Sequence, residues 1–172
     1  MAKLVMDFTH GDEATKRAFL QRHCDAAVVM DLSYLDPLPL YAEFPQLKGC
    51  FPGQFAMNGK VELHLREELP GVDEAMAAEG LHPVRVTETR LGFTLPRTLA
   101  MIVNEAYFAL AENVATKKDI DRAMVFGVNY PGGPFQWAEG RQGAFVALLD
   151  ALAASSDNQR YEVCPLLREE AR

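Results

Sequence analysis

Apolar positions in the first half of the chain follow the pattern of a βαβ unit. Residues 3–9 and 26–31 are apolar on both faces, and residues 12–24 between them carry acids at their start and suffice for a crossover helix. Strands that are apolar on both faces are typical of parallel sheets with helices above and below. We therefore predict a parallel sheet at the start of the chain.

The rest of the first half continues as short strands and one helix. The sequence Asp-Pro-Leu-Pro at residues 36–39 breaks the chain, and residues 49–51, 60–66 and 83–87 have the composition of strands. A helix near residues 72–79 ends at Gly80, because glycine takes the left-handed conformation that closes helices. The first half is thus predicted to be α/β.

The second half changes to a helical period. From residue 98 a stripe of apolar residues recurs at three and four positions over about four turns. Thr116 and Asp119 form a capping box that starts a helix at residue 117, and Gly127 ends it. The chain continues with a rigid turn at 130–134, an apolar helix at 143–154 and a charged, frayed tail at 168–172. We predict two domains, residues 1–90 (α/β) and 91–172 (all-α). The apolar stripe consists of Leu99, Ile102, Val103, Ala106 and Leu110.

Charge and composition exclude several classes of protein. Seventeen Lys+Arg against twenty-four Asp+Glu give a net charge of −7 without a basic cluster, so we expect neither nucleic acid nor a membrane surface as a partner. The longest apolar runs, 26–30 and 99–103, are far shorter than the ~18–20 residues that cross a bilayer, and Asp7 interrupts any signal-like start. Three cysteines without metal-ligand spacing are expected to be free thiols. These features predict a cytoplasmic protein.

A series of residues with distinctive order and spacing resembles the C-terminal helical domain of 3-hydroxyacyl-CoA dehydrogenases. Further upstream, residues 4–7, Lys16, Phe19, 28–30, Ser33 and Leu35 are similar to the later part of that family's nucleotide-binding domain, so the resemblance covers nearly the whole chain. It implies the second half of a Rossmann-type sheet followed by a helical domain, and a role in fatty acid metabolism. The helical-domain series comprises Gly92, Phe93, Arg97, Asn104, Glu105, Ala106, Asp119, Ile120, Asp121, Ala123, Met124, Gly127, Pro131, Gly133, Pro134 and Phe135.

The family's nucleotide-binding signature is missing from this sequence. Family members begin with a G-x-G-x-x-G turn, whose glycines let the backbone approach the pyrophosphate of NAD. The 172 residues contain no such motif, and residue 1 is followed directly by what resembles the family's fourth strand. We therefore expect no NAD site and no other cofactor, and the exposed edge of residues 3–9 is expected to pair with another chain.

The family's catalytic positions are altered here. The resemblance places its general-base histidine on Cys50 and the glutamate that orients this histidine on Glu62, while its active-site asparagine falls on Pro96. A thiol beside a carboxylate is a weak base, and proline has no amide, so the three positions are read as vestigial. Cys50 also fits a buried small hydrophobe. Glu62 fits a remnant, a buried acid with a raised pKa, or a solvent-facing strand residue.

Other candidate residues have equally simple structural interpretations. Ser33 is a fourth vestigial position, because it matches a serine of the family's active site, but its hydroxyl could instead cap the turn after a strand. The four histidines have no metal-site spacing and are expected at the surface. Phe135 and Trp137 are expected to anchor the helical core.

Three functions remain open from the sequence. We favour a catalytically inactive relative of 3-hydroxyacyl-CoA dehydrogenase, a homodimer that binds an acyl-CoA-like ligand or a full-length homologue, because the resemblance places the acyl-CoA between the domains and the dimer contact in the helical domain. The alternative is an active NAD-dependent oxidoreductase completed by a second polypeptide. A purely structural subunit is the third possibility.

Overall fold

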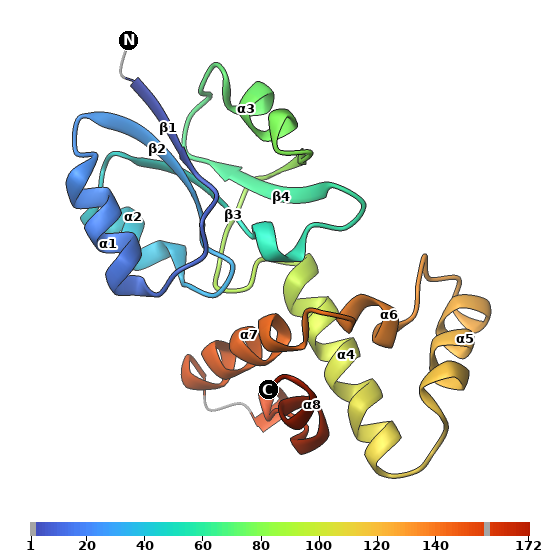
Figure 1. Ribbon diagram of the computed structural model, residues 1–172. Helices are drawn as coiled ribbons and strands as arrows, with labels where there is room; N and C mark the ends of the chain where they lie inside the picture. The colour runs from blue at the N-terminus through green and yellow to red at the C-terminus, as the bar shows by residue number, and fades with distance from the viewer. Residues whose placement is uncertain (1–2, 157–158) are drawn as a thin grey trace. The chain divides into compact units, whose positions relative to one another are not determined.

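The computed structural model describes residues 3–156 and 159–172, in which strands and helices alternate first and helices follow alone (Figure 1). The strands are β1 (Lys3–Asp7), β2 (Ala26–Asp31), β3 (Leu47–Phe51), β4 (Lys60–Leu65) and β5 (His82–Val86). The α-helices are α1 (Glu13–Arg22), α2 (Pro37–Glu43), α3 (Val72–Ala78), α4 (Leu95–Ala111), α5 (Lys117–Gly127), α6 (Pro134–Ala138), α7 (Gln142–Ala154) and α8 (Pro165–Glu170), with 3-10 turns η1 (Gly53–Phe55) and η2 (Gln159–Tyr161).

The five strands form one sheet in the order β1-β2-β3-β4-β5. The first three run parallel, as the βαβ pattern predicts, while β4 is antiparallel to β3 and parallel to β5. The carboxyl ends of β1, β2 and β3 therefore meet at one edge of the sheet, where ligand sites of open α/β sheets lie. The predicted fold class, an α/β part followed by helices, is confirmed.

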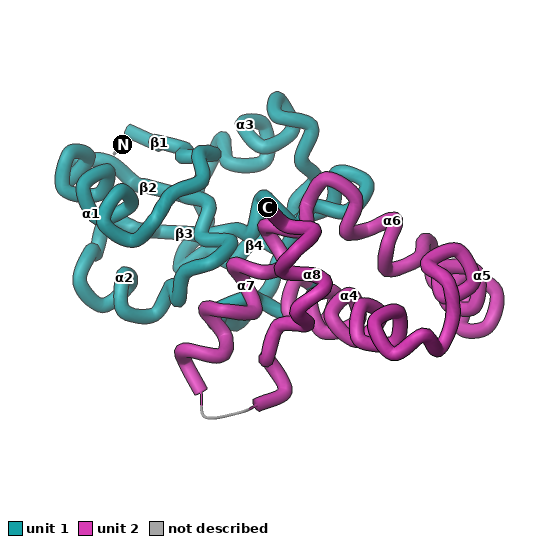
Figure 2. The backbone as a smooth tube through the Cα atoms, turned by 60° about the horizontal axis from the view of Figure 1, so that its bottom comes forward, with its two compact units in different colours: residues 1–95 teal, residues 96–172 magenta. Residues whose placement is uncertain are grey.

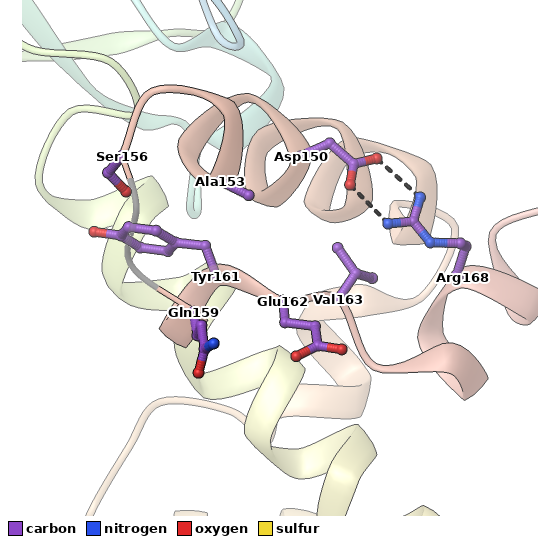
Figure 3. A pocket seen from close by; sticks show the side chains of 8 residues that line it. All are labelled: Asp150, Ala153, Ser156, Gln159, Tyr161, Glu162, Val163 and Arg168. Atoms are coloured by element: carbon purple, nitrogen blue, oxygen red, sulfur yellow. Dashed lines mark hydrogen bonds and ion pairs between the residues drawn. The ribbon is translucent and has the colours of Figure 1, made fainter.

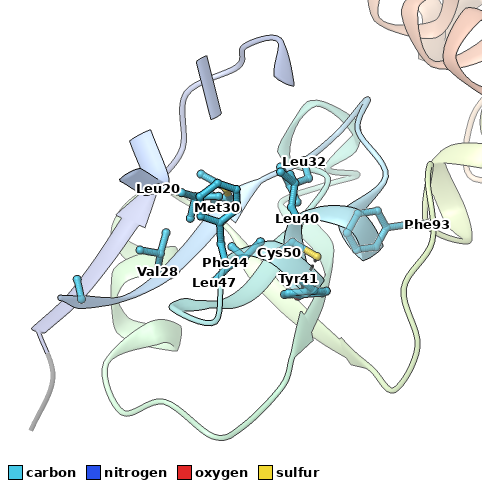
Figure 4. Packing of buried hydrophobic residues seen from close by; sticks show 11 residues of the cluster. Leu20, Val28, Met30, Leu32, Leu40, Tyr41, Phe44, Leu47, Cys50 and Phe93 are labelled. Atoms are coloured by element: carbon cyan, nitrogen blue, oxygen red, sulfur yellow. Dashed lines mark hydrogen bonds between the residues drawn. The ribbon is translucent and has the colours of Figure 1, made fainter. Parts of the chain in front are cut away.

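Helices cover both faces of this sheet (Figure 1). On one face, Leu20 of α1 and Leu40 of α2 pack with side chains of β2 and β3 in a cluster that also holds Cys50 (Figure 4). On the other face, Val72 and Met76 of α3 pack against the sheet, and both side chains are fully buried. β2 is therefore apolar on both faces because helices cover both faces of the sheet, as predicted.

Two expectations about the helices are wrong. Residues 36–39 do not simply break the chain but start α2, because Asp36 accepts a hydrogen bond from Leu38 N (3.0 Å) and the first turn of a helix needs no N–H from its prolines. The C-terminal tail is not frayed but forms α8. It is held by buried Leu167 and by two hydrogen bonds from Arg168 to Asp150, of 2.9 and 2.7 Å.

The chain divides into two compact units, Met1–Leu95 and Pro96–Arg172 (Figure 2). In the second unit, Phe135 and Trp137 are buried as expected, and Phe135 packs against Tyr107 with ring centroids 4.9 Å apart. All three cysteines are free thiols. Within the part of the chain that the structure describes, no helix has the length and apolar character needed to cross a bilayer.

Candidate functional site

The carboxyl end of β2 carries a buried carboxylate and a buried hydroxyl. Asp31 is the last residue of β2, and its Oδ1 accepts hydrogen bonds from Ser33 N (2.8 Å) and Ser33 Oγ (2.6 Å). Ser33 Oγ accepts in turn from Gln54 N (3.1 Å), in the turn after β3. The serine that the resemblance singled out therefore does not cap the turn after β2. It ties the ends of β2 and β3 together.

His10 lies against the other oxygen of the same carboxylate. Its Nδ1 is 2.8 Å from Asp31 Oδ2, and the side chain of His10 is 48% exposed whereas that of Asp31 is 2% exposed. The contact is electrostatic, because Oδ2 has no partner in hydrogen-bond geometry among the described residues. Burial raises the pKa of Asp31 above its usual value, although the hydrogen bonds from Ser33 oppose this rise. The expectation of a surface histidine is confirmed for His10, whose exposed side chain also contacts a buried acid.

The loop that carries His10 is fixed on both sides. Before it, Asp7 Oδ1 accepts from Thr9 N (3.0 Å) and Thr9 Oγ1 (2.6 Å), and Lys16 Nζ donates to Thr9 O (2.6 Å) and to Asp7 Oδ2 (2.8 Å). After it, Asp12 caps α1 by accepting from Thr15 N (2.8 Å). Burial acts to raise the pKa of Asp7, but the hydrogen bonds from Lys16 and Thr9 outweigh it, so this pKa lies below its usual value.

Cys50, which stands where the family has its general base, is a fully buried thiol in the middle of the sheet. Tyr41 Oη donates to Cys50 Sγ at 3.2 Å (Figure 4). Thr89 Oγ1 lies 3.8 Å from the same sulfur. Burial raises the pKa of Cys50 to about 12. At neutral pH the thiol is protonated, which agrees with its interpretation as a small buried side chain.

A histidine missed by the sequence interpretation lies beside this thiol. His64 pairs with Cys50 across β3 and β4, so both side chains share one face of the sheet. Its Nδ1 is 3.0 Å from Tyr41 Oη, and burial lowers the pKa of the imidazole. The expectation that all four histidines lie at the surface is wrong for His64, since it is partly buried in a polar cluster with Tyr41 and Cys50.

Glu62 and Pro96 have structural roles at the start of α4. Glu62 Oε2 accepts hydrogen bonds from Thr94 N (3.2 Å) and Leu95 N (3.0 Å), which satisfies N–H groups that a helix start leaves free. Pro96 follows as the second residue of α4, where its missing N–H costs nothing. Because Glu62 is bound to the backbone and Cys50 to Tyr41, the structure does not join the two into a catalytic pair.

The helical unit contains a polar pocket of about 520 Å³ between α7, η2 and α8 (Figure 3). Asp150 and Glu162 bring negative charge to it, and Arg168 is paired with Asp150 through both guanidinium N–H groups. A pocket of this charge does not suit a phosphate-bearing ligand. No group of three or more metal-ligating side chains is present within residues 3–156 and 159–172.

Four polar residues of the first unit could not be identified from the sequence as partners. His10 and Asp31 are in contact although they are 21 positions apart in the sequence, and Tyr41 and His64 are 23 positions apart. The available signal was the position of Asp31 at the end of an apolar strand, since polar residues at the carboxyl ends of parallel strands mark ligand sites. Nothing local in the sequence indicates that His10 faces it.

Comparisons with known proteins agree with this architecture. Residues 92–171 match the family model of the 3-hydroxyacyl-CoA dehydrogenase C-terminal domain. The chain is 46% identical over 81 residues to 3-hydroxyadipyl-CoA dehydrogenase of Escherichia coli K12, which covers 46% of this chain and 17% of that protein. It is 32% identical over 184 residues to 3-hydroxybutyryl-CoA dehydrogenase of Bradyrhizobium diazoefficiens, covering 95% of this chain and 61% of that protein.

Solved structures extend the similarity to both units. The (S)-3-hydroxybutyryl-CoA dehydrogenase of Ralstonia eutropha superposes with a TM-score of 0.74 over 97% of this chain and 64% of its own, at 21% identity, which shows the shared fold. The 3-hydroxybutyryl-CoA dehydrogenase of Escherichia coli K12 gives a TM-score of 0.66 at 27% identity, over 83% of this chain and 31% of its own. The chain spans less than two thirds of these relatives. With the fold, the matched C-terminal domain and these similarities in agreement, the chain belongs to the 3-hydroxyacyl-CoA dehydrogenase family.

Proposed function

We propose that this 172-residue chain binds an acyl-CoA-like ligand or a homologous partner without catalysing dehydrogenation. The observation that carries the proposal is the environment of Cys50. A dehydrogenase of this family needs a base for the hydroxyl proton, and Cys50 is a buried thiol whose pKa is raised to about 12 and which accepts a hydrogen bond from Tyr41. Three free thiols favour a reducing compartment, and we assign the protein to the cytoplasm.

The same proposal holds that the chain does not bind NAD by itself. Its sequence has no G-x-G-x-x-G turn, so it lacks the glycines that bring backbone N–H groups to a pyrophosphate. The site for NAD, the hydride acceptor, would then have to come from a second polypeptide. This is the alternative function, an active oxidoreductase completed by that polypeptide. That alternative still requires a base, because neither Cys50 nor Pro96 can replace the residues that the family uses.

Titration calorimetry and an activity assay test the proposal together. We expect heat of binding with butyryl-CoA and none with NADH, and no NADH formation from 3-hydroxybutyryl-CoA and NAD by the wild type or by Cys50→His. Micromolar affinity for NADH would contradict the proposed absence of NAD binding, and NADH formation after removal of host enzyme would show that the chain is a dehydrogenase. Failure to bind butyryl-CoA would remove the ligand part of the proposal.

We propose further that the protein is a homodimer that associates through its helical unit. In α5, whose residues are all described, none is buried, and Phe126 is 80% exposed. An apolar groove of about 480 Å³ lies between α4 and α5, with Ile102 and Met124 among its lining residues. Apolar surface of this kind marks interaction sites, and a second copy of the chain would bring the same surface to a twofold axis.

The dimer is tested by light scattering at tens of micromolar protein. Ile102→Glu is expected to give monomer, since it places a charge in the apolar groove. Ala153→Glu, at an exposed position of α7, is expected to leave the dimer intact. A monomeric wild type, or equal effects of the two substitutions, would contradict the proposed interface.

A further inference from the structure

The two edge strands of the sheet differ in how well they resist pairing with a further strand. β5, at one edge, contains Pro83, which has no N–H to donate, and the exposed, charged Arg85. Proline and charged side chains on an edge strand hinder pairing with another chain. β1, at the other edge (Figure 1), has no proline among its five residues, all of which are described, and it keeps a regular register with β2. Only the β5 edge is thus protected by its own sequence.

The β1 edge offers apolar side chains as well as backbone groups. Leu4 and Met6 pack on the face of the sheet that α3 covers, and Val5 packs on the face that α1 and α2 cover. These three side chains are only partly buried, whereas every residue of β2 is buried. In a parallel pair, every second residue of β1 directs its N–H and C=O groups away from β2. The edge can therefore bind one more strand by backbone hydrogen bonds and side-chain contacts together.

The sequence of β1 is complementary to itself in one antiparallel register. When Val5 lies opposite Val5 of a second copy, Leu4 lies opposite Met6 and Lys3 lies opposite Asp7. All five residues are then paired, and apolar side chains meet on both faces of the sheet. Registers centred on Lys3 or on Asp7 would pair fewer residues and would place like charges opposite each other, which is unfavourable.

The role of charge in this register is to exclude the alternatives. Asp7 already accepts hydrogen bonds from Thr9 and Lys16, so Lys3 of a second copy would meet a carboxylate whose oxygens are in use. The opposite signs of Lys3 and Asp7 therefore select the register, while the backbone and the apolar side chains supply the attraction.

We propose that β1 is an interaction surface for a second copy of this chain, in which the two β1 strands pair antiparallel about a twofold axis at Val5 and join the two sheets into one. A contact of this kind uses the same residues on both copies, as twofold symmetry requires. It is separate from the dimer proposed through the helical unit. Because a five-residue strand forms a small interface, we expect the pairing above about 0.1 mM protein, beyond the range in which the helical dimer is tested.

Cross-linking of the full chain tests the register. Val5→Cys is made together with Cys24→Ser, which removes the exposed thiol, while Cys50 and Cys164 are buried. At the twofold axis the introduced thiols are on cross-strand neighbours, whose Cβ atoms lie about 4.5–5.5 Å apart, so mild oxidation is expected to link the two copies. Lys3→Cys in the same background is the matched control. Its two thiols would lie about 13 Å apart along the strands, too far for a disulfide.

Sedimentation equilibrium between about 10 μM and about 1 mM measures the strength of the contact. Lys3→Glu places like charges opposite each other twice in the pair, so we expect the dissociation constant of this step to rise about tenfold. Lys60→Glu is the matched control, because Lys60 is an exposed lysine on β4, which is not an edge strand. It makes the same change in net charge and is expected to leave the constant unchanged. Circular dichroism checks that each variant is folded.

The outcomes separate this contact from the helical dimer. Cross-linking through residue 5 but not through residue 3, with weaker association of Lys3→Glu alone, supports the inference. Absence of this association step up to about 1 mM, equal cross-linking at both positions, or equal effects of the two glutamate variants would overturn it. A wild type that is monomeric at low concentration and still associates through β1 would support the inference and contradict only the helical dimer.

Discussion

Replacing Lys16 by methionine would isolate a buried charge in the first unit. The Lys16 and Asp7 side chains are each 2% exposed, and Nζ lies 2.8 Å from Asp7 Oδ2. Methionine matches the length and apolar stem of lysine but removes the ammonium group, so Asp7 would keep only the hydrogen bonds from Thr9. Thr9 O would also lose the hydrogen bond that it accepts from Lys16.

The expected cost is about 3–5 kcal/mol in the free energy of unfolding, the range for removing one partner of a buried ion pair. Most of this cost is the desolvation of an uncompensated carboxylate rather than the attraction that is lost. The matched control is Lys48→Met. Lys48 pairs with Glu67 at 2.9 Å, but the two side chains are 30% and 54% exposed, so the loss there is expected to be about 0–1 kcal/mol.

Urea unfolding followed by far-ultraviolet circular dichroism measures both variants. The fluorescence of Trp137, the single tryptophan, reports on the helical unit and is not a probe of the first unit. Amide exchange of β1 and β2 provides the second probe of the first unit. Equal losses of stability in the Lys16 and Lys48 variants would refute this reasoning, because burial would then not determine how much an ion pair contributes to the free energy of unfolding.

The pH dependence of stability provides an independent test of the same ion pair. The pKa of Asp7 is lowered in the folded protein, so its contribution to stability is present above the unfolded pKa of about 3.9 and is lost as the pH falls through the lowered value. In Lys16→Met we expect burial to raise this pKa instead, so acidification favours the folded variant. The difference between wild type and variant should therefore shrink as the pH falls through the raised pKa of the variant towards about 4, and shrink further as it falls through the lowered pKa of the wild type. A difference that stays constant would contradict this linkage.

Three further predictions concern the thiols, a helix start and the edge of the sheet. One thiol, exposed Cys24, is expected to react fast with a disulfide reagent, while buried Cys50 and Cys164 react only on unfolding; a second fast thiol would contradict this. Glu62→Ala is expected to cost about 1 kcal/mol in urea unfolding because backbone N–H groups lose their acceptor, and Glu62→Gln less, so equal losses would refute the capping role. Among the described strands β1 pairs only with β2, so its other edge is free to pair with another chain. If another chain covers this edge in the oligomer, the amides of residues 4–6 are all expected to exchange slowly. Fast exchange of every second amide would show that the edge is open.

Local patterns in the sequence determined the elements and the order in which they follow. The apolar run of β2 predicted residues 26–31, and the capping box predicted a helix from residue 117 to Gly127, both with the bounds that the structure has. These predictions succeed because strand and helix periods and capping hydrogen bonds depend on residues a few positions apart. The same locality misled the reading of residues 36–39, where the prolines occupy the first turn of α2.

The composition of the candidate site was decided only by the tertiary structure. His10 contacts Asp31 because β1 and β2 lie side by side and parallel, and Tyr41 reaches both Cys50 and His64 because β4 turns back antiparallel to β3. Such contacts depend on strand order and register, which are set by the packing of the whole sheet and have no local signature. The sequence alone therefore assigned the family and located Cys50 and Glu62. The fold decided that Cys50 is buried with Tyr41 and that Glu62 caps a helix. It also decided that His10 supplies the exposed imidazole beside a buried acid.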